Sequence, residues 1–258
     1  MKKTFWSLTR KIFPFFRSTY CPVCDAENAG FCPLPEFYEQ ESMKYGFIHF
    51  SSGEMTALDT YLCSHCGASD RERLYACWLG EAFQKGWLAR ENAMLHFAPE
   101  SALAASIRKK DYFSSYHTVD MSMEGVDYHA DLQSLPFDDE ICDFFICSHV
   151  LEHVDDDRAA IKELYRITRK GGCGLLMVPV CTAISQTIED PSITDEGERW
   201  RLFGQNDHVR LYSRHDYVKR VAEGGFQVRQ LGQDYFGSRM FKQLGLKPTS
   251  ILYVASKT

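Results

Sequence analysis

The clearest pattern along the chain is an alternation of short apolar runs with amphipathic stretches, which begins near residue 93. Apolar residues recur at three- and four-residue steps in three stretches, which predicts helices over 101–110, 156–169 and 214–223. Ser213 is the expected N-cap of the last helix, and glycine pairs are expected to end the last two, at 171–172 and 224–225. Buried strands are predicted for the apolar runs 93–98, 116–120, 128–131, 141–147, 174–180, 226–231 and 251–255.

Strands that alternate with helices predict an α/β fold, here a Rossmann-like, doubly wound and mostly parallel sheet over residues 91–258. The fifth strand and the helix at 214–223 are separated by an insertion at about 181–212. Leu74, Tyr75 and Trp78 are among the apolar residues at helical spacing that predict a further helix over 71–85, which Gly86 ends. We expect this helix to link the sheet to the N-terminal part of the chain, within a linking segment 71–90.

Two Cys-x-x-Cys pairs lie ahead of that helix and predict a metal site. Two residues between thiolates let both sulfurs face one ion, and four thiolates are typical of a closed, structural zinc site. Gly67 follows the second pair, where a positive φ is expected. The alternative is a redox or coincidental spacing. The predicted ligands are Cys21, Cys24, Cys63 and Cys66.

The segment between the two pairs is longer than in a simple zinc finger. We therefore interpret residues 20–70 as a zinc-ribbon-like module, with strand-like residues at 45–48 and with Cys32 and His65 as spare ligands that are not needed. Four protein ligands leave no open position, so the role of this zinc is predicted to be structural.

Composition narrows the class of protein. The chain has 258 residues, is 45% hydrophobic and carries a net charge of -6. These values are those of a globular protein, and the acidic balance argues against general nucleic-acid binding. No apolar stretch approaches the ~20 residues of a membrane-spanning helix, and no cleavable signal peptide is evident. We therefore expect a cytoplasmic location. Because the cytoplasm is reducing, paired cysteines there indicate a metal site rather than disulfides.

The first residues differ from the rest. Residues 1–20 carry five basic and no acidic residues, so a +5 segment precedes a body of -11. Aromatic residues lie between these charges, which is typical of peripheral contact with an anionic membrane surface through residues 1–17. The alternative is a tail or short helix, residues 1–19, that packs on the body.

Two of the predicted strands end in an acidic residue. Asp120 ends the second strand and Asp131 ends the third. Ligands of doubly wound sheets bind beyond the carboxyl ends of the strands. These carboxylates are therefore predicted at the binding edge.

Several segments of the predicted α/β domain carry a family resemblance. The ordered segments Asp131–Phe137, Phe144–Val154, Glu163–Ile167, Lys170–Gly172 and Val178–Pro179 resemble class I S-adenosylmethionine (SAM)-dependent methyltransferases of the type 11 group. The close resemblance covers about a third of the chain, and as a fold it extends over about 165 residues. The whole chain also resembles a subgroup in which two N-terminal Cys-x-x-Cys pairs precede such a domain.

The resemblance implies SAM as cofactor and a set of residues that bind it. Asp120 would hold the ribose hydroxyls, the Asp131–Leu132 pair would contact the adenine, and Ser148 and His149 would face the methyl-donor end. Capping or turn-forming roles are the alternatives. The implied cofactor residues are His96, Ala98, Glu100, Asp120, Asp131, Leu132, Ser148 and His149.

One turn departs from the family. After the first strand the family usually has an acid and a glycine-rich turn, whereas this chain has His96-Phe97-Ala98-Pro99-Glu100. Ala98 is nearly as small as glycine, and Glu100 could reach the amino group of the cofactor. A degenerate domain that binds no cofactor is the alternative here. Glu152 and His153, which follow His149, are interpreted as local hydrogen-bonding residues rather than catalytic ones.

The methyl acceptor is expected to contact the insertion. His208 is the candidate general base, with Asp207 as its orienting partner. Arg210 could bind an acidic group of the substrate, and Tyr212 and Asp190 are further substrate-binding candidates. The alternative is a buried His–Asp network that only fixes the insertion.

The function predicted from these residues is transfer of a methyl group from SAM to an oxygen or nitrogen of a small molecule, or of a glycan or lipid-linked acceptor. One alternative is methylation of a macromolecule docked by the zinc module. Another is a non-catalytic protein in which the zinc ribbon binds a partner and the α/β domain is a scaffold. Asp120 and Asp131 argue against the scaffold.

Overall fold

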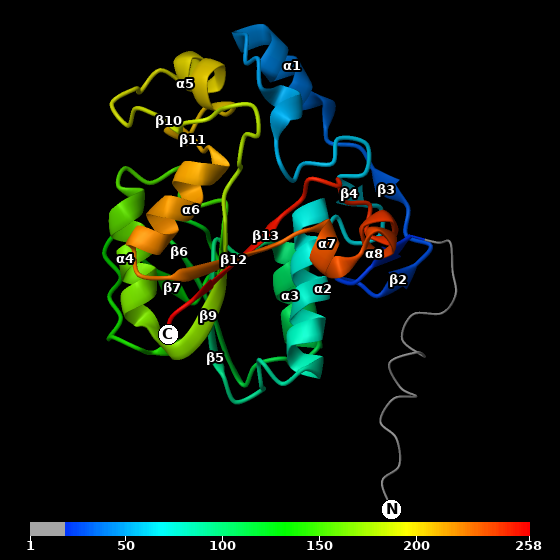
Figure 1. The fold of residues 1–258 in the computed structure, drawn as a ribbon, viewed down its shortest axis with the longest axis vertical. Helices are drawn as coiled ribbons and strands as arrows, with labels where there is room; N and C mark the ends of the chain where they lie inside the picture. Colours follow the sequence, from blue (N-terminus) through cyan, green and yellow to red (C-terminus); the bar gives the residue numbers. More distant parts are fainter. Residues whose placement is uncertain (1–18) are drawn as a thin grey trace, which may run out of the picture.

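A computed structural model describes residues 19–258 of the chain, and its centre is a seven-stranded sheet (Figure 1). Every neighbouring pair is parallel except the two pairs made by β13, which is antiparallel to both β12 and β9. The predicted mostly parallel, doubly wound sheet is therefore confirmed. In spatial order the strands are β12 (Gln227–Leu231), β13 (Leu252–Ser256), β9 (Thr168–Met177), β8 (Cys142–Ser148), β5 (Ala93–Phe97), β6 (Ser115–Asp120) and β7 (Tyr128–His129).

Helices cover both faces of this sheet (Figure 1). On one side lie α2 (Asp70–Gln84) and α3 (Ser101–Lys109), and on the other lie α4 (Asp157–Ile167) and α6 (Arg214–Glu223). Successive residues of β8 serve opposite faces, since Phe144 stacks on Trp78 of α2 at 5.8 Å while Phe145 contacts Phe226 at 5.8 Å. Burial on both faces explains why β8 is apolar at almost every position.

The boundary between α4 and β9 differs from the prediction. The helix ends at Ile167 and the strand begins directly at Thr168, so Gly171 and Gly172 lie inside β9 and do not end the helix. The Thr168 hydroxyl donates to the Leu164 carbonyl at 2.6 Å and closes the last helical turn. Both glycines pair with the backbone of Lys257 in an irregular part of the ladder, where Gly171 adopts φ +78°.

Two short pairs of antiparallel strands lie in the N-terminal module. The first pairs β1 (Tyr20–Cys21) with β2 (Ala26–Glu27), and the second pairs β3 (Phe31–Cys32) with β4 (Leu62–Cys63). Between β3 and β4 lie α1 (Glu36–Tyr45) and the single-turn helix η2 (Phe50–Ser52).

The strand-like interpretation of residues 45–48 is wrong. Tyr45 is the last residue of α1, and Gly46 ends that helix at φ +75°. The Phe47 amide donates to the Ser42 carbonyl at 2.8 Å, which completes a helix C-cap. The aromatic residues here therefore leave a helix end and do not alternate along a strand.

The insertion folds beside the module. It contains β10 (Ile188–Glu189), α5 (Glu196–Phe203) and β11 (Arg210–Leu211), and β10 pairs with β11. Helices α1 and α5 lie together at the top of Figure 1. A small buried cluster of Cys181, Phe203 and Leu211 packs against Phe47 of the module.

The C-terminal part, which includes α7 (Gln233–Phe236) and α8 (Ser238–Gln243), also contacts the module, where the Thr60 hydroxyl donates to the Gly245 carbonyl at 2.7 Å. Arg73 of α2 is completely buried between these parts. Its guanidinium donates to the carbonyls of Leu244, Tyr61 and Ala68 at 2.8, 2.9 and 3.0 Å. One buried cation thus joins the module, the linking helix and the C-terminal segment.

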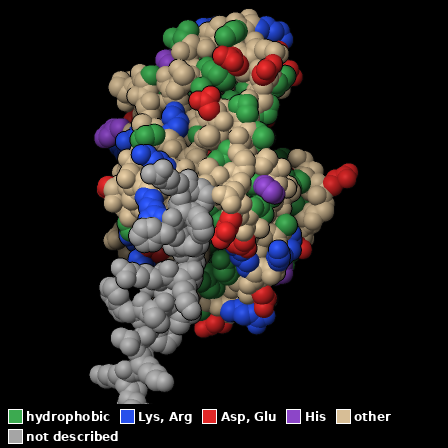
Figure 2. All heavy atoms as spheres, turned by 90° about the vertical axis from the view of Figure 1, so that its right-hand side faces the viewer, with side chains coloured by type: hydrophobic (Ala, Val, Ile, Leu, Met, Phe, Trp, Pro, Cys, Tyr) green, Lys and Arg blue, Asp and Glu red, His purple; other side chains and the backbone are tan. Residues whose placement is uncertain are grey.

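The predicted membrane-contacting segment 1–17 lies outside the described residues. Among residues 19–258, no helix combines the length and the apolar character needed to cross a membrane. Acidic and basic side chains are interspersed on the described part of the face drawn in Figure 2.

Candidate functional site

The carboxyl ends of β5, β6 and β8 bring most of the predicted cofactor residues to one edge of the sheet. β5 and β8 are neighbours and lead to opposite faces, so the topological switch point lies between them. Ala98 follows β5 and His149 follows β8 on either side of this point. Ala98 has φ +45°, the left-handed region that glycine usually occupies, and its amide donates to the Val119 carbonyl at 2.9 Å.

A polar chain fixes the turn after β5. The buried ring of His96 lies 2.8 Å from the Tyr116 hydroxyl and 3.0 Å from a carboxylate oxygen of Glu100. Arg71 of α2 approaches the other oxygen of Glu100 at 3.6 Å. Burial alone would raise the pKa of Glu100, but the hydrogen bond with His96 and the nearby Arg71 charge lower it overall. Glu100 is therefore a charged group held in a defined orientation.

Asp120 has one oxygen engaged and one available. Its Oδ1 accepts from the backbone amides of Ser122 and Met123 at 2.8 and 2.7 Å. Oδ2 accepts no hydrogen bond from the described residues, and the side chain is partly exposed. Such a carboxylate is oriented by its own turn and can accept from ligand hydroxyls.

Asp131 and Leu132 lie in a loop that α4 clamps. Asp131 accepts from the Gln133 amide at 2.9 Å, and Leu132 is buried. Farther along the loop, the Leu135 amide donates to Glu163 at 2.8 Å, and Arg166 donates to the Leu135 carbonyl at 3.1 Å. The Glu163–Arg166 segment of the resemblance thus has a positional role, because it holds the loop that carries the Asp131–Leu132 pair.

A cavity of about 410 Å³ opens beside the end of β8. Most of its walls come from the N-terminal module, the turn after β8 and the insertion, and Arg71 of α2 and Pro179 after β9 complete them. Its size is that of a small-molecule site. The aromatic and polar residues lining it include Tyr38, Phe47, Phe50, Tyr61, Arg71, His149, Glu152, His153, Phe203, Asp207 and His208.

His149 lies where the carboxyl edge of the sheet meets this cavity. It follows Ser148, whose hydroxyl lies 3.1 Å from that of Tyr75, and it adopts φ +56°. Burial and the neighbouring Arg71 hold the pKa of His149 well below its usual range, so the ring is neutral.

Glu152, His153 and His208 meet in the wall of the cavity. Glu152 is fully buried and both its carboxylate oxygens are without a hydrogen bond. Its interpretation as a local hydrogen-bonding residue is therefore wrong. Burial raises the pKa of Glu152 to about 7. Burial, together with the nearby His153, lowers the pKa of His208 to about 3, so His208 is neutral.

The predicted His208–Asp207 pair is rearranged. Asp207 lies 3.4 Å from Nδ1 of His153, whereas Nδ1 of His208 faces the Phe203 carbonyl at 3.3 Å. The orienting partner expected for His208 is thus a backbone carbonyl, because Phe203 ends α5 with its carbonyl directed at the ring.

The three predicted substrate-binding side chains are engaged elsewhere and do not line the cavity. Arg210 is buried and donates to the carbonyls of Leu151, Val154 and Asp155. The Tyr212 hydroxyl donates to buried Asp157 at 2.6 Å. Asp190 is exposed and accepts from the amide and hydroxyl of Ser192 at 3.0 and 2.6 Å. Their polar groups support the turn after β8 and the insertion.

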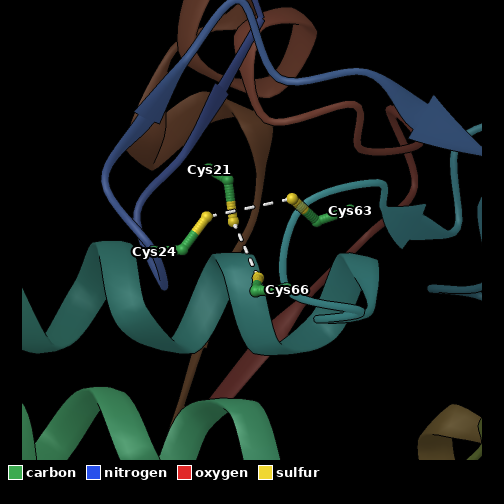
Figure 3. Close-up of side chains that lie close together, drawn as sticks. All are labelled: Cys21, Cys24, Cys63 and Cys66. Carbon is green, nitrogen blue, oxygen red and sulfur yellow. Dashed lines mark hydrogen bonds between the residues drawn. The ribbon is translucent and has the colours of Figure 1, made fainter.

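The four predicted metal ligands converge from β1 and β4 and the turns that follow these two strands (Figure 3). The sulfurs of Cys21 and Cys66 are 3.7 Å apart, and those of Cys24 and Cys63 are 4.0 Å apart. A tetrahedral zinc site with bonds of ~2.3 Å has sulfur–sulfur edges of ~3.8 Å. Gly67 has the expected positive φ, +74°. The donor set and its spacing therefore fit one zinc ion.

Comparison with known proteins shows what part of the α/β body is similar to. Residues 94–176 match the family model of a methyltransferase domain. The matched segment runs from β5 into β9, about a third of the chain, and this part of the α/β body is similar to that family. No curated protein sequence matches the chain.

Solved structures similar to the chain include YcgJ from Bacillus subtilis, at 16% identity and a TM-score of 0.43, covering 70% of this chain and 98% of that one. A SAM-dependent methyltransferase from Mesorhizobium loti has 13% identity and a TM-score of 0.43, covering 69% of this chain and 97% of that one. A phosphoethanolamine N-methyltransferase from Haemonchus contortus, solved with S-adenosylhomocysteine, has 13% identity and a TM-score of 0.46, covering 70% of this chain and 53% of that one.

Two residues of the candidate site were not predicted from the sequence. Arg71 was visible only as the start of a helix, and nothing local indicated that it lines the cavity and faces Glu100. Glu152 lies between His149 and His153 in the sequence. This clustering of possible metal ligands could have pointed to Glu152. Its third histidine neighbour, His208, comes from the insertion and is brought there only by the fold.

Proposed function

We propose that this chain methylates an oxygen or nitrogen of a small molecule, or of the compact polar end of a glycan or lipid-linked acceptor. The observation that carries the proposal is the cavity beside the switch point, which the module, the turn after β8 and the insertion enclose together. A cavity of about 410 Å³ suits a small acceptor group.

The residues at the sheet edge fit SAM, which when bound supplies an activated methyl group on a sulfonium. The free oxygen of Asp120 would accept from the ribose hydroxyls. The Asp131–Leu132 pair would meet the adenine, and the left-handed turn at Ala98 lets the backbone approach the ligand closely. Charged Glu100 would face the amino group.

The cavity residues would act on the acceptor. Methyl transfer is an in-line displacement, so most of the catalysis comes from holding the acceptor atom against the methyl group. The aromatic walls from the module would orient the acceptor. Neutral His208 would receive its proton where it has one, with the adjacent His153–Asp207 pair beside it.

The module would hold one structural zinc on its four cysteines. Because the same module supplies Tyr38, Phe47 and Tyr61 to the cavity wall, its proposed role is to complete the acceptor site. This favours a small acceptor over a macromolecule docked by the module.

Calorimetry with SAM tests the cofactor assignment. We expect the zinc-replete chain to bind SAM. Asp120→Ala is expected to bind it roughly 10- to 100-fold more weakly, because it loses charge-assisted hydrogen bonds. Glu124→Ala, an exposed acid in the same loop, is the matched control and should bind like the wild type. Absence of binding by the wild type would exclude the enzyme, and unchanged affinity in Asp120→Ala would refute the cofactor placement.

The acceptor class needs a separate measurement. Radiolabelled methyl transfer into a cell extract, fractionated by size afterwards, should place the label in the small-molecule or lipid-soluble fraction. Label confined to protein or nucleic acid would favour macromolecular methylation.

A further inference from the structure

The carboxylate of Glu152 is surrounded by histidine nitrogens that it does not hydrogen-bond. Its Oε1 lies 3.4 Å from Nδ1 of His149, 3.8 Å from Nε2 of His153 and 4.0 Å from Nε2 of His208. Both oxygens of this fully buried side chain are without a partner. A buried carboxylate without a hydrogen bond is costly unless another group compensates it.

These separations suit ligands around one metal ion. Zinc bonds of ~2.0–2.1 Å to nitrogen and oxygen give ligand–ligand edges of ~3.3 Å in a tetrahedral site. One ligand atom each from Glu152, His153 and His208 lies within 4.8 Å of the others. The contacts are too long for hydrogen bonds but need only a small inward shift to enclose an ion.

The other ring nitrogens are held in the way that metal-binding histidines require. Nδ1 of His208 faces the Phe203 carbonyl at 3.3 Å, and Nδ1 of His153 faces the Asp207 carboxylate at 3.4 Å. Protonation at Nδ1 leaves the lone pair on Nε2, the nitrogen that each ring turns toward Glu152. A carbonyl or carboxylate on the outer nitrogen is the usual second shell of a histidine ligand.

We propose that Glu152, His153 and His208 bind a divalent first-row transition-metal ion in the acceptor cavity, separate from the four-cysteine site. Two imidazoles and one carboxylate favour zinc, iron or manganese over magnesium and calcium. Three protein ligands leave coordination positions open toward the cavity.

The ion would define the class of acceptor. An oxygen on one of the open positions would be polarised and would release its proton to solvent water more readily, so metal activation would replace the general-base role assigned above to His208. The acceptor would then be a hydroxyl compound, with the acceptor oxygen itself on the metal. This last step rests on the proposed methyltransferase function, whereas the metal site does not.

Zinc binding by the full-length chain tests the site. After purification with zinc and gel filtration, metal analysis should give two equivalents per chain. Glu152→Gln and His208→Ala should each retain one, and calorimetry with zinc chloride should show the remaining affinity weakened roughly 100-fold or more. Asp207→Asn should weaken it roughly 10-fold through His153.

His215→Ala is the matched control, because His215 is an exposed histidine of α6 outside the cavity. It should bind zinc like the wild type. SAM binding and the melting temperature of each variant report whether it is folded and whether the cofactor proposal holds independently. Cys63→Ser should remove the other equivalent and leave this one.

Two results would overturn the proposal. One is a wild-type chain whose only zinc is lost in Cys63→Ser. The other is folded Glu152→Gln and His208→Ala variants that bind as much zinc, as tightly, as His215→Ala.

Discussion

The Tyr45 ring lies parallel to the indole of Trp200, with ring centroids 6.2 Å apart and planes 9° from parallel. Tyr45 ends α1 in the module, and Trp200 is a buried residue of α5 in the insertion. The stack therefore joins two segments that each contribute a wall to the same cavity, across more than half of the chain.

Trp200→Ala should weaken the packing of α5 against α1. Removing a buried Trp side chain costs about 3–5 kcal/mol in typical cores. We expect a lower melting temperature and faster proteolysis within residues 36–45. Trp87→Ala is the control, since Trp87 is 46% exposed. Equal melting temperatures for the two variants would show that the stack does not hold module and insertion together.

The parts of the fold that were predictable are those set by local pattern. The continuously apolar β8 and the Ser213 cap of α6 follow from neighbouring residues, and both are present: the Ser213 side chain accepts from the Asp216 amide at 3.3 Å. Both Cys-x-x-Cys pairs were equally visible, because each pair needs only its own turn to point its sulfurs at one ion.

What could not be predicted depends on contacts between distant segments. Whether Arg210 faces substrate or backbone is decided by the turn 151–155, whose carbonyls take its donors. The meeting of His208 with Glu152 depends on how the insertion folds back over β8. Gly171 and Gly172 were misassigned because their pairing partner, Lys257, lies at the far end of the chain.

Loss of one cysteine ligand should remove the structural zinc. Cys63→Ser is expected to contain one zinc equivalent fewer than the wild type and to unfold the module, because three thiolates no longer complete the site and metal binding contributes to the folding free energy. Cys32→Ser changes an exposed cysteine of the same module and should keep its zinc. Metal analysis with circular dichroism distinguishes them. A folded Cys63→Ser with full metal content would refute the site.

Arg210 should matter for stability rather than for substrate affinity. Its guanidinium holds three carbonyls of the turn that carries Glu152 and His153, and it pairs with Glu189 at 3.2 Å. Removing one partner from a buried charged network costs about 3–5 kcal/mol. Arg210→Gln should therefore unfold at lower denaturant concentration than the exposed-site control Arg201→Gln. An Arg210→Gln variant that is as stable as the wild type but binds the acceptor more weakly would support the substrate-binding prediction instead.

Glu163 should make the stability of the loop that carries Asp131 and Leu132 depend on pH. The hydrogen bonds from Arg166 lower the pKa of Glu163, outweighing burial. Because the folded pKa lies below the unfolded one, the stabilisation is present above the unfolded value of about 4.5 and is lost as pH falls through the folded pKa. Glu163→Gln removes the charge at every pH. We expect the free energy of unfolding of the wild type to exceed that of the variant by about 1 kcal/mol at neutral pH. This difference should narrow below pH ~4.5. Urea unfolding of both proteins at a series of pH values measures this gap. A gap that stays constant or widens in acid would mean that the neutral hydrogen bonds, and not the carboxylate charge, clamp the loop that holds Asp131.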